Sequence, residues 1–378
     1  MLRHTFAAIA VSSLLAGCAS WFEGAQAYEP TPLAKIEQTH ALNLKWQARV
    51  PEASQGLFVP AHYQGVLAAS GNNGEVVLLD ALTGKKNAEF RVKGETLGAG
   101  VAAGEGAYFV GNDKGELLAV DATGKVLWRQ KLTSVLSEPP VLAAGMVVTH
   151  AADGRLTAFD AKDGKSIWTQ WQAPPSLMVR ATTPVMLAIG KEVLVTGIAG
   201  GKLAVYNLQS GAPLWEGTVA SPRGGSELER VTDVVSQPQF DGRRVCAVAY
   251  QGRVACFDAR GGNLVWAREV ASSRGLALDS RAAYVTGEDG AIWAFDIETG
   301  RNLWKNDALR YRDVSGPVML GKNILVLDGE GYAHLLASED GRLIGRTRTG
   351  AEGTLSQPVS LGDAAYVQGR NGRLAVLN

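Results

Sequence analysis

The stretch Ala294–Trp304 reads Ala-Phe-Asp-Ile-Glu-Thr-Gly-Arg-Asn-Leu-Trp. An apolar run leads into Asp296, a Thr-Gly turn follows, and Trp304 comes four residues after Gly300. Glycine tolerates a positive φ, and an aspartate side chain can hydrogen-bond the turn that follows it. The stretch therefore predicts a strand, a tight turn and a second strand that carries the Trp.

This phrase is an internal repeat. Its copies open at Gly74, Gly115, Gly154, Gly201, Gly252, Gly290, Gly331 and Gly372, at spacings of 41, 39, 47, 51, 38, 41 and 41 residues. An alternating, β-rich run and a short polar-Gly turn precede the copies, which is typical of a hairpin, and a further strand precedes that run. Four strands in about 40 residues make one propeller blade. We expect an all-β, eight-bladed β-propeller with four-stranded antiparallel blades over residues 41–378.

The two ends of the chain predict that the ring is closed. The eighth copy stops at Asn378, before its fourth strand, whereas Leu44-Lys-Trp-Gln47 near the N-terminus matches the fourth strand of other copies. We expect residues 41–50 to form the outer strand of blade 8. This closure would remove the exposed edge of an open ring.

The repeated tryptophans are predicted to be structural. A substrate-stacking role would have to recur around the whole rim, whereas packing between neighbouring blades explains each copy by the large area that a buried indole removes from water. The set is Trp46, Trp128, Trp168, Trp215, Trp266 and Trp304.

Composition excludes two broad classes of protein. The 378 residues carry 37 Lys and Arg against 37 Asp and Glu, so the net charge is zero, whereas nucleic-acid binders usually carry a basic excess. A hydrophobic content of 46% can fill a core, which argues against a long disordered protein. We expect a soluble domain that binds no nucleic acid.

The N-terminus reads as a targeting segment. Residues 5–15 form an apolar run that is too short to span a membrane but suits a signal peptide. Leu15-Ala16-Gly17-Cys18 resembles the lipobox of bacterial lipoproteins, which are cleaved before the cysteine and acylated on it. We expect residues 1–17 to be removed, Cys18 to be lipidated and residues 18–40 to form a tether. An incidental cysteine after an ordinary signal peptide is the alternative.

The remaining cysteines, Cys246 and Cys256, lie in one expected hairpin around Gln251-Gly252. A two-residue turn would pair Cys256 with Ala247 and leave Cys246 one step out of register, so a disulfide needs a bulge or a longer turn. An even pair in an oxidising periplasm allows a disulfide. Two buried thiols are the alternative.

The phrase at Ala294–Trp304 resembles the tryptophan-docking motif of eight-bladed quinoprotein propellers. Two families share it, the PQQ-dependent dehydrogenases and the BamB lipoproteins of outer-membrane assembly, and the lipobox, length and layout resemble the second. The dehydrogenases have an adjacent Cys-Cys pair, a Ca²⁺ site and long insertions. This sequence has no Cys-Cys and no His pair with metal-binding spacing. We expect no enzymatic activity, no cofactor and no metal.

Two long connections between blades, 169–183 and 216–237, flank blade 4 and should emerge side by side on one face. Long ordered loops in a compact domain are often functional, although tolerated insertion is the alternative. The first loop carries Leu177, Val179 and Arg180, and apolar anchors with an arginine are typical of protein-binding hot spots. The resemblance implies that these residues, with Asp233 of the second loop, bind a partner.

That partner, by resemblance, is the barrel insertase BamA, bound through its periplasmic POTRA domains. The resemblance implies a scaffold lipoprotein on the periplasmic face of the outer membrane that aids insertion of barrel proteins. Direct contact with unfolded barrel precursors is left open. The alternatives are another periplasmic propeller adaptor and a degenerate PQQ-dependent dehydrogenase.

Overall fold

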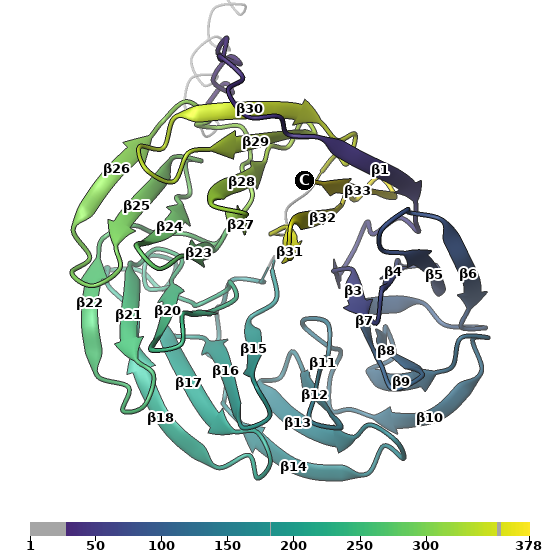
Figure 1. The fold of residues 1–378 in the computed structure, drawn as a ribbon. Helices are drawn as coiled ribbons and strands as arrows, with labels where there is room; N and C mark the ends of the chain where they lie inside the picture. The colour runs from purple at the N-terminus through teal and green to yellow at the C-terminus, as the bar shows by residue number, and fades with distance from the viewer. Residues whose placement is uncertain (1–27, 182, 354–356) are drawn as a thin grey trace, which may run out of the picture.

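Eight β-sheets stand around a central axis in the computed structural model, which describes residues 28–181, 183–353 and 357–378 (Figure 1). All the regular elements in these ranges are strands, and each sheet forms one blade. The prediction of an all-β, eight-bladed propeller is therefore confirmed.

The blades follow one another along the chain. Blade 1 contains β3 (Ala61–Tyr63), β4 (Val66–Ser70), β5 (Glu75–Asp80) and β6 (Lys86–Arg91). Blade 2 contains β7 (Leu97–Gly104), β8 (Ala107–Asn112), β9 (Glu116–Val120) and β10 (Val126–Lys131). Blade 3 contains β11 (Val141–Ala143), β12 (Met146–His150), β13 (Arg155–Asp160) and β14 (Ser166–Trp171). Blade 4 contains β15 (Met186–Ile189), β16 (Val193–Ile198), β17 (Lys202–Asn207) and β18 (Pro213–Thr218).

The second half of the ring repeats this order. Blade 5 contains β19 (Gln239–Phe240), β20 (Arg244–Val248), β21 (Val254–Asp258) and β22 (Leu264–Arg268). Blade 6 contains β23 (Leu276–Leu278), β24 (Ala282–Thr286), β25 (Ile292–Asp296) and β26 (Asn302–Asn306). Blade 7 contains β27 (Val318–Leu320), β28 (Asn323–Leu327), β29 (Tyr332–Leu336) and β30 (Leu343–Arg348). Blade 8 contains β31 (Val359–Leu361), β32 (Ala364–Gln368), β33 (Arg373–Leu377) and β1 (Leu44–Arg49).

The N-terminal strand closes the ring as expected. β1 pairs antiparallel with β33, and Gln47 lies opposite Ala375. A short strand that the repeat did not predict, β2 (Leu57–Phe58), adds to blade 2 by pairing parallel with β7. Within each blade the first strand lies toward the axis and the fourth forms the outer rim (Figure 1), and in blade 2 the added strand β2 lies beyond β7.

The repeated phrase builds the contact between neighbouring blades. The Oδ1 atom of Asp296 accepts hydrogen bonds from the backbone N–H of Thr299 at 2.9 Å and from its hydroxyl at 2.7 Å. Gly300 then turns with a φ of 67°. A Cβ atom at Gly300 would lie 2.6 Å from the ring of Trp266, so only glycine lets the Trp of the preceding blade pack there.

The same docking recurs around the ring. The six predicted tryptophans each pack on the turn glycine of the next blade, in the pairs Trp46–Gly84, Trp128–Gly164, Trp168–Gly211, Trp215–Gly262, Trp266–Gly300 and Trp304–Gly341. Five of the indoles also donate Nε1–H to a backbone carbonyl of that blade, the acceptors being Ala161, Leu208, Ala259, Ile297 and Ser338. The Trp46 indole joins the closing strand to blade 1, and its Nε1 has no acceptor among the described residues.

The hydrophobic core is divided into clusters that neighbouring blades share. In one cluster Val195 and Leu203 of blade 4 pack with Val245 and Phe257 of blade 5. Burial of these side chains between blades stabilises the ring at roughly 25 cal/mol per Å² of apolar surface. Each blade therefore depends on its neighbours, which gives the loops above them a rigid base.

A disulfide joins Cys246 on β20 to Cys256 on β21. These residues lie directly opposite each other, because the hairpin turn spans residues 249–253 and the Ala249 N–H donates to the Arg253 carbonyl at 3.1 Å. The register expected from a two-residue turn, with Cys256 opposite Ala247, is wrong. The longer turn removes the offset between the two cysteines.

The described N-terminal segment begins at residue 28 and runs along blade 7 to reach β1 (Figure 1). The expected signal peptide and Cys18 lie outside the described residues. Within the described ranges, no helix has the length and apolar character needed to cross a membrane.

Candidate partner-binding face

Two long loops flank blade 4 on one face of the ring. One joins β14 to β15 across residues 172–185, and the other joins β18 to β19 across residues 219–238. Both leave the ends of fourth strands, so they lie on the face that carries the hairpin between β12 and β13. The Gln237 side chain donates to the Met186 carbonyl at 2.8 Å, which ties the second loop to β15 where the first loop ends. We call these two loops and the hollows between them the loop face.

Asp233 positions the first loop. Its Oδ2 atom accepts from the Val179 N–H at 2.8 Å, and its Oδ1 atom accepts from the Gly200 N–H at 2.9 Å. The side chain is buried, with 2% exposure. A buried carboxylate is stable only when donors replace its water, and here backbone amides from two different loops do so. The carboxylate thereby fixes the β14–β15 loop to the hairpin between β16 and β17.

That Asp233 contacts a partner stays a prediction, although in this structure its side chain faces the protein interior. Its two oxygens already accept hydrogen bonds inside the protein, and its burial leaves no oxygen on the surface. The joint action of Arg180 and Asp233 on one partner surface also stays a prediction, and of the two side chains only that of Arg180 is exposed here. Sequence reasoning placed both residues on the right loops but could not show which way each side chain points.

The held loop displays apolar side chains. Leu177 is 45% exposed, Met178 is 49% exposed, and Val179, whose N–H is bound by Asp233, is half-buried. Exposed apolar side chains on an ordered loop, next to the exposed Arg180, resemble the anchors of protein interfaces. Met178 was not among the predicted contact residues, although its position between Leu177 and Val179 could have suggested it.

The second loop forms an ordered turn beside the first. The Glu229 carboxylate accepts from the backbone N–H groups of Ser226 and Gly225, and these bonds lower the pKa of Glu229. The Arg230 Nε donates to the Gly224 carbonyl at 3.1 Å. Leu228 remains 67% exposed on this turn. The second loop thus adds an apolar side chain with charged neighbours to the loop face.

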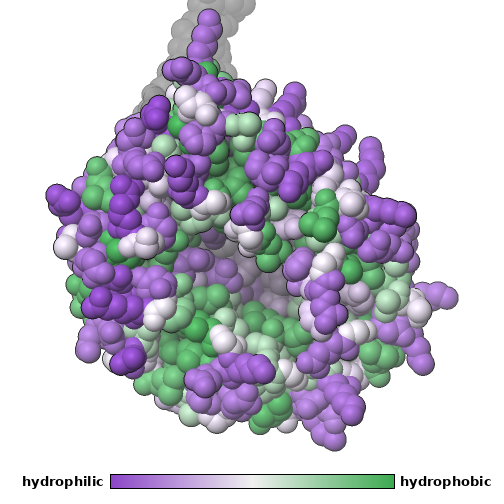
Figure 2. Space-filling view, in the orientation of Figure 1, coloured by the Kyte–Doolittle hydropathy of each residue, from purple (hydrophilic) through white to green (hydrophobic). Residues whose placement is uncertain are grey.

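An apolar cavity of about 360 Å³ opens beneath the first loop. Its apolar walls include Leu136, Met178, Val185, Ile198 and Val234. A second hollow of about 270 Å³ lies on the other side of the loop, between Leu177 and Arg230. Figure 2 shows one face of the ring, hollowed at its centre, with hydrophobic residues gathered around the opening over β11 and β15. The two cavities beside the first loop can accept apolar side chains of a partner.

A buried acid that sequence reasoning missed braces the cavity wall. The Glu138 Oε2 atom accepts from the N–H groups of Val185 at 2.7 Å and Met186 at 3.1 Å. Its Oε1 atom lies 2.8 Å from Nδ1 of His150. Glu138 is therefore engaged in joining blade 3 to blade 4. The sequence gives no signal for Glu138, because this residue lies in an irregular segment before β11, outside the repeated phrase.

The two buried carboxylates near the first loop are engaged by the protein's own backbone. The carboxylates of Asp233 and Glu138 bind backbone amides, so neither is placed to act on a ligand. Within the described ranges, no group of three or more His, Cys, Asp or Glu side chains could hold a metal ion.

Comparisons with known proteins point to one family. The family model described as outer membrane protein assembly factor BamB matches residues 72–306. An outer membrane protein assembly factor BamB from Bordetella pertussis is 36% identical over 98% of this chain and 96% of its own length. The relative of the same name from Nitrosomonas eutropha is 36% identical over 89% of this chain and 82% of its own length.

Solved structures are similar to the whole ring. The crystal structure of BamB from Moraxella catarrhalis superposes with a TM-score of 0.81 at 25% identity, covering 89% of this chain and all of that one. A quinohemoprotein alcohol dehydrogenase from Comamonas testosteroni gives a TM-score of 0.68 at 13% identity, covering 92% of this chain and 78% of that one. The second similarity shows a shared fold alone.

Proposed function

The chain belongs to the BamB family of outer membrane protein assembly factors, and from this premise we propose that it is a non-enzymatic scaffold that binds the barrel insertase BamA through the loop face. The observation that carries the proposal is the first loop, which displays Leu177 and Met178 while its backbone is held by Asp233. A pre-ordered loop loses little conformational freedom on binding, so its apolar contacts contribute more fully to affinity.

The loop face suits a folded protein partner. Its apolar anchors stand above cavities of about 360 Å³ and 270 Å³, which can accept side chains from the other protein. Arg180 lies at the edge of the larger cavity and can pair with a carboxylate of the partner. The POTRA domains of BamA are the partner that the resemblance implies.

We propose that the protein is held at the periplasmic face of the outer membrane by lipid on Cys18. The lipobox Leu15–Cys18 supports this proposal, as does the absence of an Asp directly after the cysteine. Several acyl chains on one residue give stable attachment, whereas a single chain gives only marginal binding. The propeller then acts as an anchored adaptor.

The proposal that the chain is no enzyme rests on its polar groups. The buried carboxylates at the loop face bind backbone amides, and the family name is that of an assembly factor. A quinohemoprotein alcohol dehydrogenase shares the fold, but its sequence is only 13% identical, so this similarity does not support a dehydrogenase activity.

Co-purification with detergent-solubilised BamA tests the proposed function. The wild-type protein should co-purify, and a variant with Leu177→Ala and Arg180→Glu should be lost from the complex. Leu214→Ala is a matched control, because Leu214 is also exposed (53%) but lies on β18 at the outer rim of blade 4. Full retention of the double variant would exclude the loop face as the binding site.

A further inference from the structure

The described part of the N-terminal tether lies against blade 7. The Thr31 N–H donates to the Arg310 carbonyl, and the His40 N–H donates to the Ile344 carbonyl, both at 3.1 Å. The Tyr28 ring stacks on Tyr311 at a centroid distance of 4.5 Å. The tether therefore follows the surface of the ring for more than ten residues before β1 begins.

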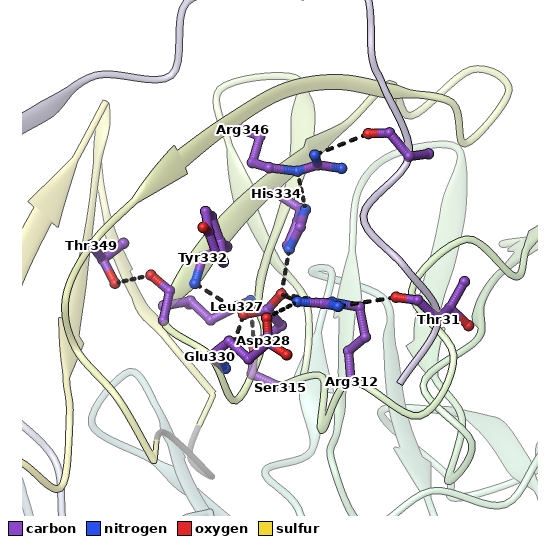
Figure 3. Close-up of polar contacts among 12 residues, drawn as sticks. Thr31, Arg312, Ser315, Leu327, Asp328, Glu330, Tyr332, His334, Arg346 and Thr349 are labelled. Atoms are coloured by element: carbon purple, nitrogen blue, oxygen red, sulfur yellow. Dashed lines mark hydrogen bonds and ion pairs between the residues drawn. The ribbon is translucent and has the colours of Figure 1, made fainter. Parts of the chain in front are cut away.

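Two arginines of blade 7 reach the backbone of this tether (Figure 3). The Arg312 Nη1 donates to the Thr31 carbonyl at 3.0 Å, and the Arg346 Nη1 donates to the Ala34 carbonyl at 3.0 Å. Both bonds are made to main-chain oxygens, so they depend on the path of the tether and not on its side chains. A guanidinium donor makes such bonds stronger than a neutral donor would.

The Arg312 guanidinium is held by two acids, the buried Asp328 and the exposed Glu330. Its Nε and Nη2 atoms each lie 2.9 Å from Oδ2 of Asp328, and Nη2 lies 2.5 Å from Oε2 of Glu330. The Arg312 side chain is 3% exposed and Asp328 is fully buried. Burial lowers the pKa of Arg312, but its bonds to Glu330 and Asp328 outweigh burial and leave the pKa raised. The residues on either side, Tyr311 and Asp313, adopt left-handed conformations with φ of 60° and 54°.

The Arg346 guanidinium is held by a buried histidine. Its Nε lies 3.2 Å from Nδ1 of His334, whose Nε2 lies 3.0 Å from Oδ2 of Asp328. An arginine can only donate, so Nδ1 accepts and the proton of a neutral His334 is on Nε2, from which it is donated to Asp328. One carboxylate thus orients both arginines, one directly and one through the imidazole (Figure 3).

We propose that Arg312, Asp328, His334 and Arg346 form a tether clamp, a docking site on blade 7 for the extended backbone of residues 31–34. Through the clamp, the tether holds the propeller at the edge of the ring formed by blade 7. Figure 1 shows that this edge lies across the ring from blades 3 and 4, so the loop face of blade 4 is kept away from the tether. Its consequence for orientation at the membrane rests on the proposed lipid anchor at Cys18.

The clamp shortens the free part of the tether. If only β1 held the chain, the steps from Cys18 to Leu44 could span at most about 90 Å, whereas those from Cys18 to Thr31 span at most about 45 Å. The clamp thus roughly halves the distance that the ring can move from its anchor. A shorter free segment confines the loop face to a smaller volume, which raises its effective concentration near a membrane-bound partner.

Hydrogen exchange of the full-length protein in detergent tests the clamp. The Thr31 and His40 amides should be protected in the wild type. In Arg346→Ala their exchange should become at least about tenfold faster, because a hydrogen bond from a charged donor contributes more than a neutral one. Arg348→Ala is the matched control, because Arg348 lies on the same strand but pairs with Glu352. It should leave the two amides protected.

A second variant guards against a folding defect in blade 7. Tyr28→Ala alters only the tether, and loss of its ring pair should speed Thr31 exchange about fivefold. The Cys18→Ser variant should keep the wild-type exchange pattern even if it leaves the membrane, which separates the clamp from the anchor. Unprotected Thr31 and His40 amides in the wild type, or equal exchange in Arg346→Ala and Arg348→Ala, would overturn the proposal.

Discussion

The loop face and the tether clamp both hold an irregular segment by its backbone, but with side chains of opposite charge. At the loop face the Asp233 carboxylate accepts from two N–H groups, whereas at the clamp two guanidinium groups donate to carbonyls. In the first case the held loop leaves Leu177 and Met178 exposed above cavities. At the clamp, the held segment of the tether is itself what the site binds. A charged side chain that binds a backbone can thus hold a loop so that its side chains are exposed, or it can attach one segment of the chain to the ring.

The two regions also differ in how their charges are balanced. Asp233 is paired with amide dipoles alone, while the Arg312 guanidinium lies between the carboxylates of Asp328 and Glu330. A buried ion pair that loses one partner leaves a charge without solvent, which costs more than loss of a dipole. The clamp should therefore be the more sensitive region to substitution.

The largest expected effect is that of Arg312→Ala on stability. It leaves the buried Asp328 carboxylate without its guanidinium partner, and we expect the free energy of unfolding to fall by about 4 kcal/mol. Chemical denaturation measures this change. Arg348 lies on β30 and pairs with exposed Glu352, so Arg348→Ala should change the free energy of unfolding by less than about 1 kcal/mol. Equal effects of the two variants would contradict the special role of the clamp.

The next largest effect is expected for Asp233→Ala. Loss of two hydrogen bonds to a buried charge should lower the free energy of unfolding by about 3 kcal/mol. The Val179 and Gly200 amides should lose protection from hydrogen exchange, and binding of BamA should weaken because the loop is no longer pre-ordered. Asp233→Asn keeps one acceptor and should fall between wild type and Asp233→Ala. Unchanged protection of Val179 in Asp233→Ala would be inconsistent with the positioning role.

A third substitution separates binding from folding. Leu177→Ala with Arg180→Glu should weaken binding of BamA by about 2 kcal/mol, roughly thirtyfold in Kd, as loss of an interface anchor does. The Tm should stay within error of wild type, because both side chains are exposed. Titration of purified components measures the affinity. A parallel loss of Tm and affinity would point to a structural role for this loop.

The smallest effect is a pH dependence of the clamp. Burial lowers the pKa of His334 more than the bond to Asp328 raises it, so the folded protein favours the neutral imidazole. Stability from neutral His334 is complete above its unfolded pKa of about 6.5 and is lost as pH falls through the lower folded value. Protonation would place a proton between Nδ1 and Arg346, close to Arg312, with the Tyr332 ring alongside.

Hydrogen exchange of Thr31 and His40, corrected for the intrinsic pH dependence, measures this effect. Protection should decrease below about pH 6.5, while the amides of the loop face keep theirs. The Asp328 carboxylate does not contribute in this range, because bonds from His334 and the Tyr332 N–H overcome burial and lower its pKa. Protection that is constant between pH 7 and pH 5 would contradict a neutral His334 whose pKa is lowered by burial.

The repeat allowed most of the fold to be predicted, because each blade uses the same local chemistry. Asp296, Gly300 and Trp304 recur at fixed spacing, and their roles in turn and docking follow from residue type alone. Closure of the ring by β1 was predictable for the same reason. The register of the two cysteines could not be predicted, because it depends on the length of the turn between β20 and β21, which departs from the repeat.

The candidate sites were only partly predictable. The two long loops were found as departures from the repeat, and Leu177 and Arg180 are exposed there as expected. The burial of Asp233 was not foreseen, since irregular loops have no period from which the direction of a side chain follows. Arg312 and Arg346 gave no signal either, because their partners in the tether are main-chain carbonyls some 280 or more residues away.

Site-specific photocrosslinking in cells tests the central claim most directly. A photoreactive residue at Leu177 on the loop face should form a crosslink to BamA. The same residue at Leu82, which is 80% exposed in the turn between β5 and β6 on the opposite face, should form none. Crosslinks from Leu82 as strong as those from Leu177, or none from Leu177, would contradict binding of the insertase through the loop face.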